Sequence, residues 1–211
     1  MDNRNYRTIL FFCWCLNAFA LFGQDTLILD PMTSRVQDCI VNSRMTIIGF
    51  PQSTEISASA WTNRGVPVVN RGLLNFMDIP DNITLIKASL SLYGIPSISN
   101  GNHSTSGGSN ECLIQRITTE WDEKLVNWNN QPSTTTENQV VLIESVYPLE
   151  DYLDIDITSL VEDVLIKKEC SFGFMLKLQQ EEHYRRMIFA SSNHHNLSLH
   201  PKLVLIYRTN N

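Results

Sequence analysis

Apolar and polar residues alternate one by one in short runs along most of the chain, and this period of two restricts the fold more than any other feature. In residues 86–93, Ile86, Ala88, Leu90 and Leu92 alternate with Lys, Ser, Ser and Tyr. Such alternation is typical of a strand with one buried face, because successive side chains point to opposite sides of a sheet. Comparable runs are 26–29, 36–41, 45–48, 56–61, 71–79, 112–117, 139–144, 152–157, 172–178, 185–190 and 202–207. About a dozen short strands at this spacing predict an all-β sandwich.

One segment departs from this period and predicts a short α-helix. Ser159 is placed to cap its N-terminus, and Glu162 follows three residues later, as in a capping box. Apolar residues recur there at helical spacing, at Leu160, Val161, Val164 and Leu165. About nine residues are too few for a helix that is stable alone. We therefore expect this helix to lie across a sheet or to cap one end of the sandwich.

The N-terminus has the organisation of a secretory signal peptide. Arg4 and Arg7 precede an almost wholly apolar run at residues 9–22. Ala18-Phe19-Ala20 offers one small-residue cleavage signal, and Gly23 before Gln24 offers another. This run is shorter than the ~20 residues that a helix needs to cross a bilayer. We therefore predict that residues 1–23 are a signal peptide and that the protein is secreted.

The remaining residues, 24–211, are expected to form a single domain. Apolar residues make up 43% of the whole chain, which is enough for one hydrophobic core. The signal peptide carries two Arg and one Asp, so its removal changes the formal net charge from −6 to −7. A mildly acidic domain is a poor partner for nucleic acid or anionic lipid, because both require a basic face. No other apolar run is long enough to insert into a membrane.

Three cysteines follow the signal peptide, at Cys39, Cys112 and Cys170. An exported protein can form a disulfide, and any one of three pairs is open to these residues. The alternative is that all three are small buried hydrophobic residues. C-x-x-C spacing is absent, which argues against a zinc knuckle or a thioredoxin-like site.

Residues 116–132 contain two tryptophans, Trp121 and Trp128, seven positions apart. Acidic residues surround the first, and Asn and Gln residues surround the second. A buried Trp needs a partner for its N–H group, and neighbouring Asn side chains suit a tight, hydrogen-bonded corner. We therefore predict a loop that both rings fix to the sheet as part of the structural core. A platform for ligand stacking is the alternative.

Six segments carry a resemblance to a known family. The Trp segment reads W-D-E followed by V-N-W-N-N-Q-P. The others are R-G-L-L-N-F-M-D-I-P (71–80), I-K-A-S-L-S-L-Y (86–93), L-D-I-D-I-T-S-L-V (153–161), F-G-F-M-L (172–176) and H-P-K-L-V-L-I-Y (200–207). In this order they resemble the DNRLRE (disaggregatase-related repeat) domain, also classed as carbohydrate-binding module family 96. Residues 26–49 match that pattern poorly, and Asn63-Arg64-Gly65 stands where the family usually has Asn-Gly.

This resemblance implies a jelly-roll β-sandwich with one short helix, and a non-catalytic domain that binds an extracellular polysaccharide. It transfers no catalytic residue to this chain. Jelly-roll carbohydrate modules often hold a structural Ca²⁺ through Asp, Asn and main-chain oxygens. Calcium is therefore the cofactor that the analogy of fold suggests, although the chain has no D-x-D-x-D-G loop.

Sugar-binding sites combine aromatic rings for stacking with planar polar groups, and the fork of Arg matches a uronate carboxylate. Two short segments bring such residues together. Trp61 lies three residues before Arg64, and Tyr184 directly precedes Arg185 and Arg186. These five are the candidate ligand-binding residues, and they allow for an acidic polysaccharide. The alternative is that they are solvated surface residues.

Residues 96–110, a low-complexity stretch of Ser, Gly, Asn and Thr, are expected to form a mobile loop at one end of the sheets, because they contain too little apolar material to order themselves.

Signatures of common catalytic sites, such as G-x-S-x-G, H-E-x-x-H and the P-loop, are absent. Asp154 and Asp156, outward from one strand about 6.5–7 Å apart, are a carboxylate pair that a glycosidase could use. His194 and His195 are metal-ligand types. A polar strand face and a loop tip explain these residues equally well, so we predict no enzyme. The alternative function is a structural or adhesive cell-surface protein that binds a protein partner through an exposed apolar patch.

Overall fold

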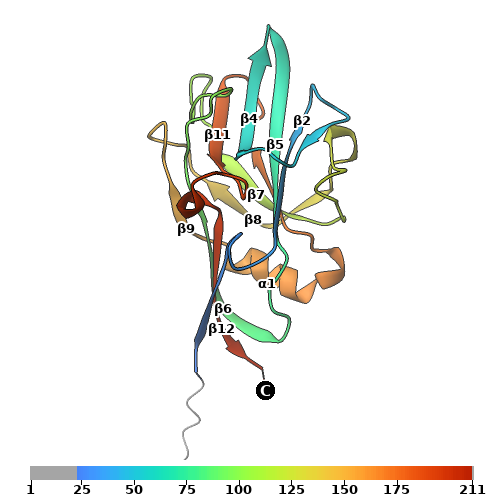
Figure 1. Cartoon of the computed structure of the whole chain (residues 1–211), viewed down its shortest axis with the longest axis vertical. Coiled ribbons are helices and arrows are strands. Elements are labelled where there is room, and N and C mark those ends of the chain that lie inside the picture. Colours follow the sequence, from blue (N-terminus) through green and yellow to red (C-terminus); the bar gives the residue numbers. More distant parts are fainter. Residues whose placement is uncertain (1–22, 211) are drawn as a thin grey trace, which may run out of the picture.

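The computed structural model describes residues 23–210. The signal peptide predicted for residues 1–23 lies outside this range except for Gly23, so it stays a prediction. The described chain folds into two antiparallel sheets and one short α-helix, α1 (Thr158–Ile166), as Figure 1 shows. This architecture confirms the predicted all-β sandwich. Within residues 23–210, no helix has the length and apolar character needed to cross a membrane.

The smaller sheet has four strands, in the order β1 (Asp25–Leu29), β12 (Lys202–Thr209), β6 (Ile83–Leu92) and β9 (Tyr152–Asp156). The larger sheet runs through β11 (Arg185–Ala190), β4 (Glu55–Asn63), β5 (Val66–Phe76), β10 (Phe174–Leu178), β7 (Cys112–Ile117) and β8 (Thr134–Leu142). It also includes β2 (Val36–Asn42), which pairs with β5 and with the short β3 (Gly49–Phe50). The long β5 pairs with β4 along its first half and with β2 and β10 along its second half. Strands β2 and β4 therefore meet at the middle of β5, where Asn70 pairs with Asn42 and with Ser59.

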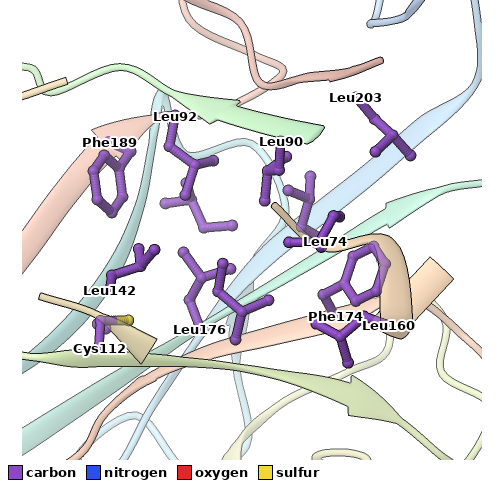
Figure 2. Close-up of a cluster of buried hydrophobic side chains, with 14 of the residues drawn as sticks. Leu74, Leu90, Leu92, Cys112, Leu142, Leu160, Phe174, Leu176, Phe189 and Leu203 are labelled. Atoms are coloured by element: carbon purple, nitrogen blue, oxygen red, sulfur yellow. The ribbon is translucent and has the colours of Figure 1, made fainter. Parts of the chain in front are cut away.

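The main core lies between the two sheets (Figure 2). The larger sheet contributes Leu74, Phe174 and Leu176, and α1 contributes Leu160. The facing side chains of the smaller sheet are Leu90, Leu92, Leu203 and Leu205. All of these are almost fully buried, and burying one such side chain contributes roughly 1.5–3 kcal/mol. This core fixes the sheet on which the candidate site is built.

A second apolar cluster covers the opposite face of the larger sheet. Leu73 belongs to it, whereas the next residue along β5, Leu74, belongs to the main core. Trp121 and Trp128 pack against this cluster. The Nε1–H group of Trp121 donates a hydrogen bond of 2.8 Å to the carbonyl oxygen of Phe172. The Trp segment is therefore held to the sheet by packing and by one hydrogen bond from a ring.

Two local predictions were wrong in their boundaries. Residues 45–48 form no strand, because the Asn42 carboxamide oxygen accepts hydrogen bonds from the N–H groups of Arg44 and Met45 and turns the chain. The helix begins at Thr158 without a side-chain cap on its N-cap residue. The N–H group of Thr158, at the first position of the helix, donates to the carboxylate of Asp156. The capping box predicted from Ser159 and Glu162 is therefore not formed.

Strand β9 and the cysteines also differ from expectation. Asp154 has φ +52°, and the pairing of β6 with β9 shifts register nearby. This irregularity breaks the alternation of buried and exposed residues, so the neighbours Leu153 and Asp154 are both exposed. All three described cysteines are free, and Cys39 and Cys112 are buried whereas Cys170 is exposed. Neither a disulfide among them nor burial of all three holds.

Candidate functional site

The β4–β5 hairpin projects from one end of the sandwich, at the top of Figure 1, and the described C-terminus lies at the other end. Arg64 and Gly65 make its two-residue turn, with φ values of +53° and +78°. Two positive φ angles define the type I′ turn, whose twist matches that of paired strands. The exposed Arg64 side chain is therefore carried at the tip of a regular hairpin.

A pocket of about 500 Å³ lies beside this hairpin. Its polar lining residues are Asn42, Arg44, Ser59, Thr62, Asn63, Arg64, Asn70, Ser99, Asn100 and Arg186. The apolar ones are Met45, Trp61 and Val68. Among the residues that the structure describes, no Asp or Glu lines this pocket. Its walls thus offer cations, amides and hydroxyl groups together with one large aromatic ring.

Arg186 is fixed at this pocket by contacts on two sides. Its guanidinium carbon lies 4.1 Å from the centroid of the Trp61 ring. Its Nε–H group donates to the carbonyl oxygen of Asn102 at 2.5 Å. The backbone of Gly101 is so close that a Cβ added there would come within 2.7 Å of the Arg186 Nη2 atom. Burial lowers the pKa of Arg186 and the charge of Glu55 opposes this effect, so the cation is held in place and partly removed from water.

The other two cations of the pocket, Arg44 and Arg64, are exposed. In the described part of the chain, neither has a carboxylate within ion-pair distance. The carboxamide of Asn42 donates to that of Asn70 at 2.6 Å, which ties β2 to β5 at the lining of the pocket. The pocket therefore combines one fixed guanidinium with two whose charges are uncompensated.

Tyr184 extends the aromatic surface next to the pocket. Its ring meets the Trp61 ring edge-on, with centroids 5.1 Å apart and an interplanar angle of 88°. Its backbone has φ +65°, an unusual value for a bulky side chain. The side chain is nevertheless 45% exposed, so the strained backbone presents an accessible aromatic ring.

The family model of carbohydrate-binding module family 96 matches residues 35–207. The chain belongs to carbohydrate-binding module family 96. The match begins next to β2 and ends within β12, so it contains every residue of the pocket and all of the main core except the residues of β1. It confirms the resemblance to family 96 that was drawn from the six sequence segments. A search of curated proteins finds none that matches this chain.

Three of the five predicted ligand-binding residues line the pocket of this family 96 module, namely Trp61, Arg64 and Arg186. Arg185 lies apart from it. Its side chain is buried, donates to the Gly107 carbonyl oxygen at 2.9 Å and to Gln180 Oε1 at 2.7 Å, and pairs with Glu182 at 2.6 Å. Neighbouring residues of a strand point to opposite faces of the sheet. The Arg185 side chain is therefore bonded within the protein, whereas the Arg186 side chain lines the pocket.

Sequence reasoning missed the loop between β6 and β7 as part of the module's pocket. The prediction that residues 96–110 form a mobile excursion was wrong. Ser104 exchanges two backbone hydrogen bonds with Arg186, of 2.9 and 3.0 Å, and His103 and Asn110 are buried. Polar side-chain and backbone bonds order this loop in place of apolar packing, and it brings Ser99 and Asn100 to the pocket.

Within residues 23–210, no group of three or more His, Cys, Asp or Glu side chains is placed to hold an ion. His200 uses its Nε2 atom in a 2.7 Å bond with the carbonyl oxygen of His194, and the rings of His194 and His195 lie against each other at 4.2 Å. Structural calcium, for which the analogy of fold also invoked Asn and main-chain oxygens, stays a prediction.

Proposed function

We propose that this family 96 module is exported, non-catalytic, and binds an acidic extracellular polysaccharide in the pocket beside the β4–β5 hairpin. The observation that carries the proposal is the set of three arginines, Arg44, Arg64 and Arg186, around one pocket whose described lining includes no carboxylate. The chain as a whole has a formal net charge of −6. A cationic pocket on an acidic protein selects an anionic ligand locally, while the overall charge disfavours nucleic acid.

The geometry suits a chain of charged sugar rings. Arginine recognises carboxylate and sulfate-like groups through paired N–H donors. Arg186 is already oriented by Trp61 and by the Asn102 carbonyl oxygen, so little conformational entropy is lost when it binds. The carboxamide of Asn63 supplies donors and an acceptor for sugar hydroxyl groups. The Nδ2 group of Asn100 already donates to the carboxylate of Glu55, so Asn100 offers its Oδ1 atom as an acceptor.

The test is affinity electrophoresis of the chain from Gln24 onward against polygalacturonate, alginate and neutral glucans. We expect retardation by the acidic polymers, and loss of it in an Arg44→Ala/Arg64→Ala double variant. Arg208→Ala is the control, because Arg208 is exposed near the end of β12, and the described C-terminus that follows it lies at the opposite end of the molecule from the hairpin. Retardation that survives the double variant, or that is equal for neutral glucans, contradicts the proposed site.

Two further assays test the rest of the proposal. Repeating the electrophoresis with EDTA tests whether binding requires calcium. Measuring new reducing ends in the incubated polysaccharide tests whether the module is non-catalytic.

A protein partner is the second candidate, and exposed apolar residues favour it. The connection between β8 and β9 exposes Ile143, Val146 and Tyr147, each about 70% accessible. If the module is an adhesin of this kind, labelled protein will bind cells after their surface glycans are removed. Val146→Ser/Tyr147→Ser would then abolish binding, whereas the arginine variants would not.

A further inference from the structure

His103 is a buried imidazole in the polar loop between β6 and β7, with 6% of its surface exposed. Its Nδ1 atom accepts a hydrogen bond of 2.9 Å from the backbone N–H of Ile188. Since a backbone N–H can only donate, Nδ1 carries no proton. The proton is therefore on Nε2, which lies 2.9 Å from the carbonyl oxygen of Glu150 and donates to it. Both ring nitrogens are satisfied by the neutral form of the side chain.

The residues on either side of His103 hold Arg186. The carbonyl oxygen of Asn102 accepts from the Arg186 side chain, and Ser104 pairs with the Arg186 backbone in both directions. Gly101 packs its backbone against the guanidinium group. His103 thus fastens a short segment, residues 99–104, to β11. The two residues that bond to Arg186, Asn102 and Ser104, are its direct neighbours in this segment.

We propose that His103 is a positioning residue of the glycan site, whose neutral imidazole holds residues 99–104 on β11 and so keeps Arg186 against Trp61. The inference rests on the proposed function. Protonation would place an N–H group on Nδ1, facing the N–H of Ile188, and the hydrogen bond would become a repulsive contact. The segment then loses its attachment at Ile188, while the backbone bonds between Ser104 and Arg186 remain. The Asn102 carbonyl oxygen no longer holds the Arg186 side chain firmly, and glycan affinity falls in acid.

The surroundings of the imidazole set the pH at which this happens. The rings of Phe189 and Tyr152 lie 5.1 and 6.3 Å from it, from β11 and β9. The charged groups that act on it are Glu150 and Asp151, which favour the proton, and Arg186, which opposes it. Burial is the largest effect, and it lowers the pKa of His103 below its ordinary value of about 6.5. The bond between His103 and Ile188 is therefore intact at neutral pH and is lost only in acid.

The experiment compares the wild type with His103→Asn between pH 8 and 4.5. The Oδ1 atom of Asn can accept from the N–H of Ile188 but does not titrate. Dextran sulfate is the probe, because its ester sulfates stay ionised throughout. We expect the wild type to lose about tenfold in affinity, as for one buried hydrogen bond, and His103→Asn to keep one affinity across this range. His103→Gln, which retains a donor toward Glu150, replaces it if the first variant does not fold. His195→Asn is the control, since His195 is exposed, and should keep the wild-type profile.

A second measurement separates this inference from the proposed function. The protection factor of the Ile188 amide, measured by hydrogen exchange without glycan, should fall in acid for the wild type and stay constant for His103→Asn. Identical pH profiles of the two proteins in affinity and protection would overturn the role of His103. If no acidic polymer binds at any pH, the proposed function fails, whereas constant protection of Ile188 separately refutes the attachment by His103.

Discussion

The guanidinium of Arg186 covers one face of the Trp61 ring at 4.1 Å, and this contact joins β11 to β4 at the pocket wall. A stacked Arg–Trp pair contributes attraction between the cation and the ring, and it also orients the fork of the guanidinium. Removing the ring therefore changes the ligand site without touching the main core.

We expect Trp61→Ala to weaken the binding of polygalacturonate by about tenfold or more, because both the stacking surface and the support of Arg186 are lost. Isothermal titration calorimetry measures this change. Tyr147→Ala is the matched control, since it removes an exposed aromatic ring from the β8–β9 connection. Equal affinities of Trp61→Ala and the wild type would remove this pocket from consideration as the glycan site.

Salt should weaken the interaction, because the charges of Arg44 and Arg64 are exposed and screened by ions. We expect the affinity for polygalacturonate to fall several-fold when NaCl is raised from about 0.05 to about 0.5 M. The Arg44→Ala/Arg64→Ala variant should show a smaller slope of affinity against salt. A salt-independent affinity in the wild type would argue for recognition of neutral hydroxyl groups instead.

Arg185→Ala should destabilise the fold rather than act on the ligand alone. The substitution leaves the Gly107 carbonyl oxygen and Gln180 without their donors, and it removes a buried cation from its partner Glu182. The expected loss is about 2 kcal/mol in the free energy of unfolding, measured by urea denaturation. Arg208→Ala, at an exposed position, should change it by less than about 0.5 kcal/mol. Unchanged stability of Arg185→Ala would show that the bonds of Arg185 to Gly107, Gln180 and Glu182 do not stabilise the fold.

The buried carboxyl of Asp38 makes the stability depend on pH. Burial raises its pKa from 3.8 to about 6, opposed by hydrogen bonds from Ser192. Between these two values the folded state binds more protons than the unfolded state, so the contribution of Asp38 to the free energy of unfolding falls as the pH rises. It is lowest above pH 6, where the buried group is charged.

Asp38→Asn removes this titration, and the Asn side-chain oxygen can still accept from the N–H of Ser192. We expect the variant to be more stable than the wild type by about 1–3 kcal/mol at pH 7, and to lose this advantage toward pH 4. Thermal or urea unfolding at several pH values provides the comparison. Glu144→Gln, at an exposed site, is the control. A variant that is less stable at pH 7 would show that the charged carboxyl is favourable where it lies.

The parts of the fold that the sequence predicted are those set by local pattern. Alternation in residues 86–93 predicts β6, and the three-residue spacing of Trp61 and Arg64 places both on one hairpin. Arg44 and Asn100 could not be found in this way, because strand pairing far apart in sequence brings them to the pocket. The pairing of Asn42 with Asn70 and of Ser104 with Arg186 has no local signal.

The choice between Arg185 and Arg186 was open for a related reason. Alternation shows that the two side chains point to opposite faces, but the pairing of Arg186 with Ser59 decides which face is the pocket. Asp154 shows that alternation itself can fail within a strand. Its positive φ breaks the alternation within β9, and the residue type alone did not reveal the irregularity.

The left-handed backbone at Arg64 gives this hairpin a trade-off between folding and recognition. An L-residue with a long side chain is disfavoured in that conformation by roughly 1 kcal/mol relative to glycine. Changing Arg64 to glycine would thus relieve strain at the tip while removing a cation from the pocket. Selection for stability alone would drive this position toward glycine or asparagine, and an arginine there is consistent with selection for the charge it presents.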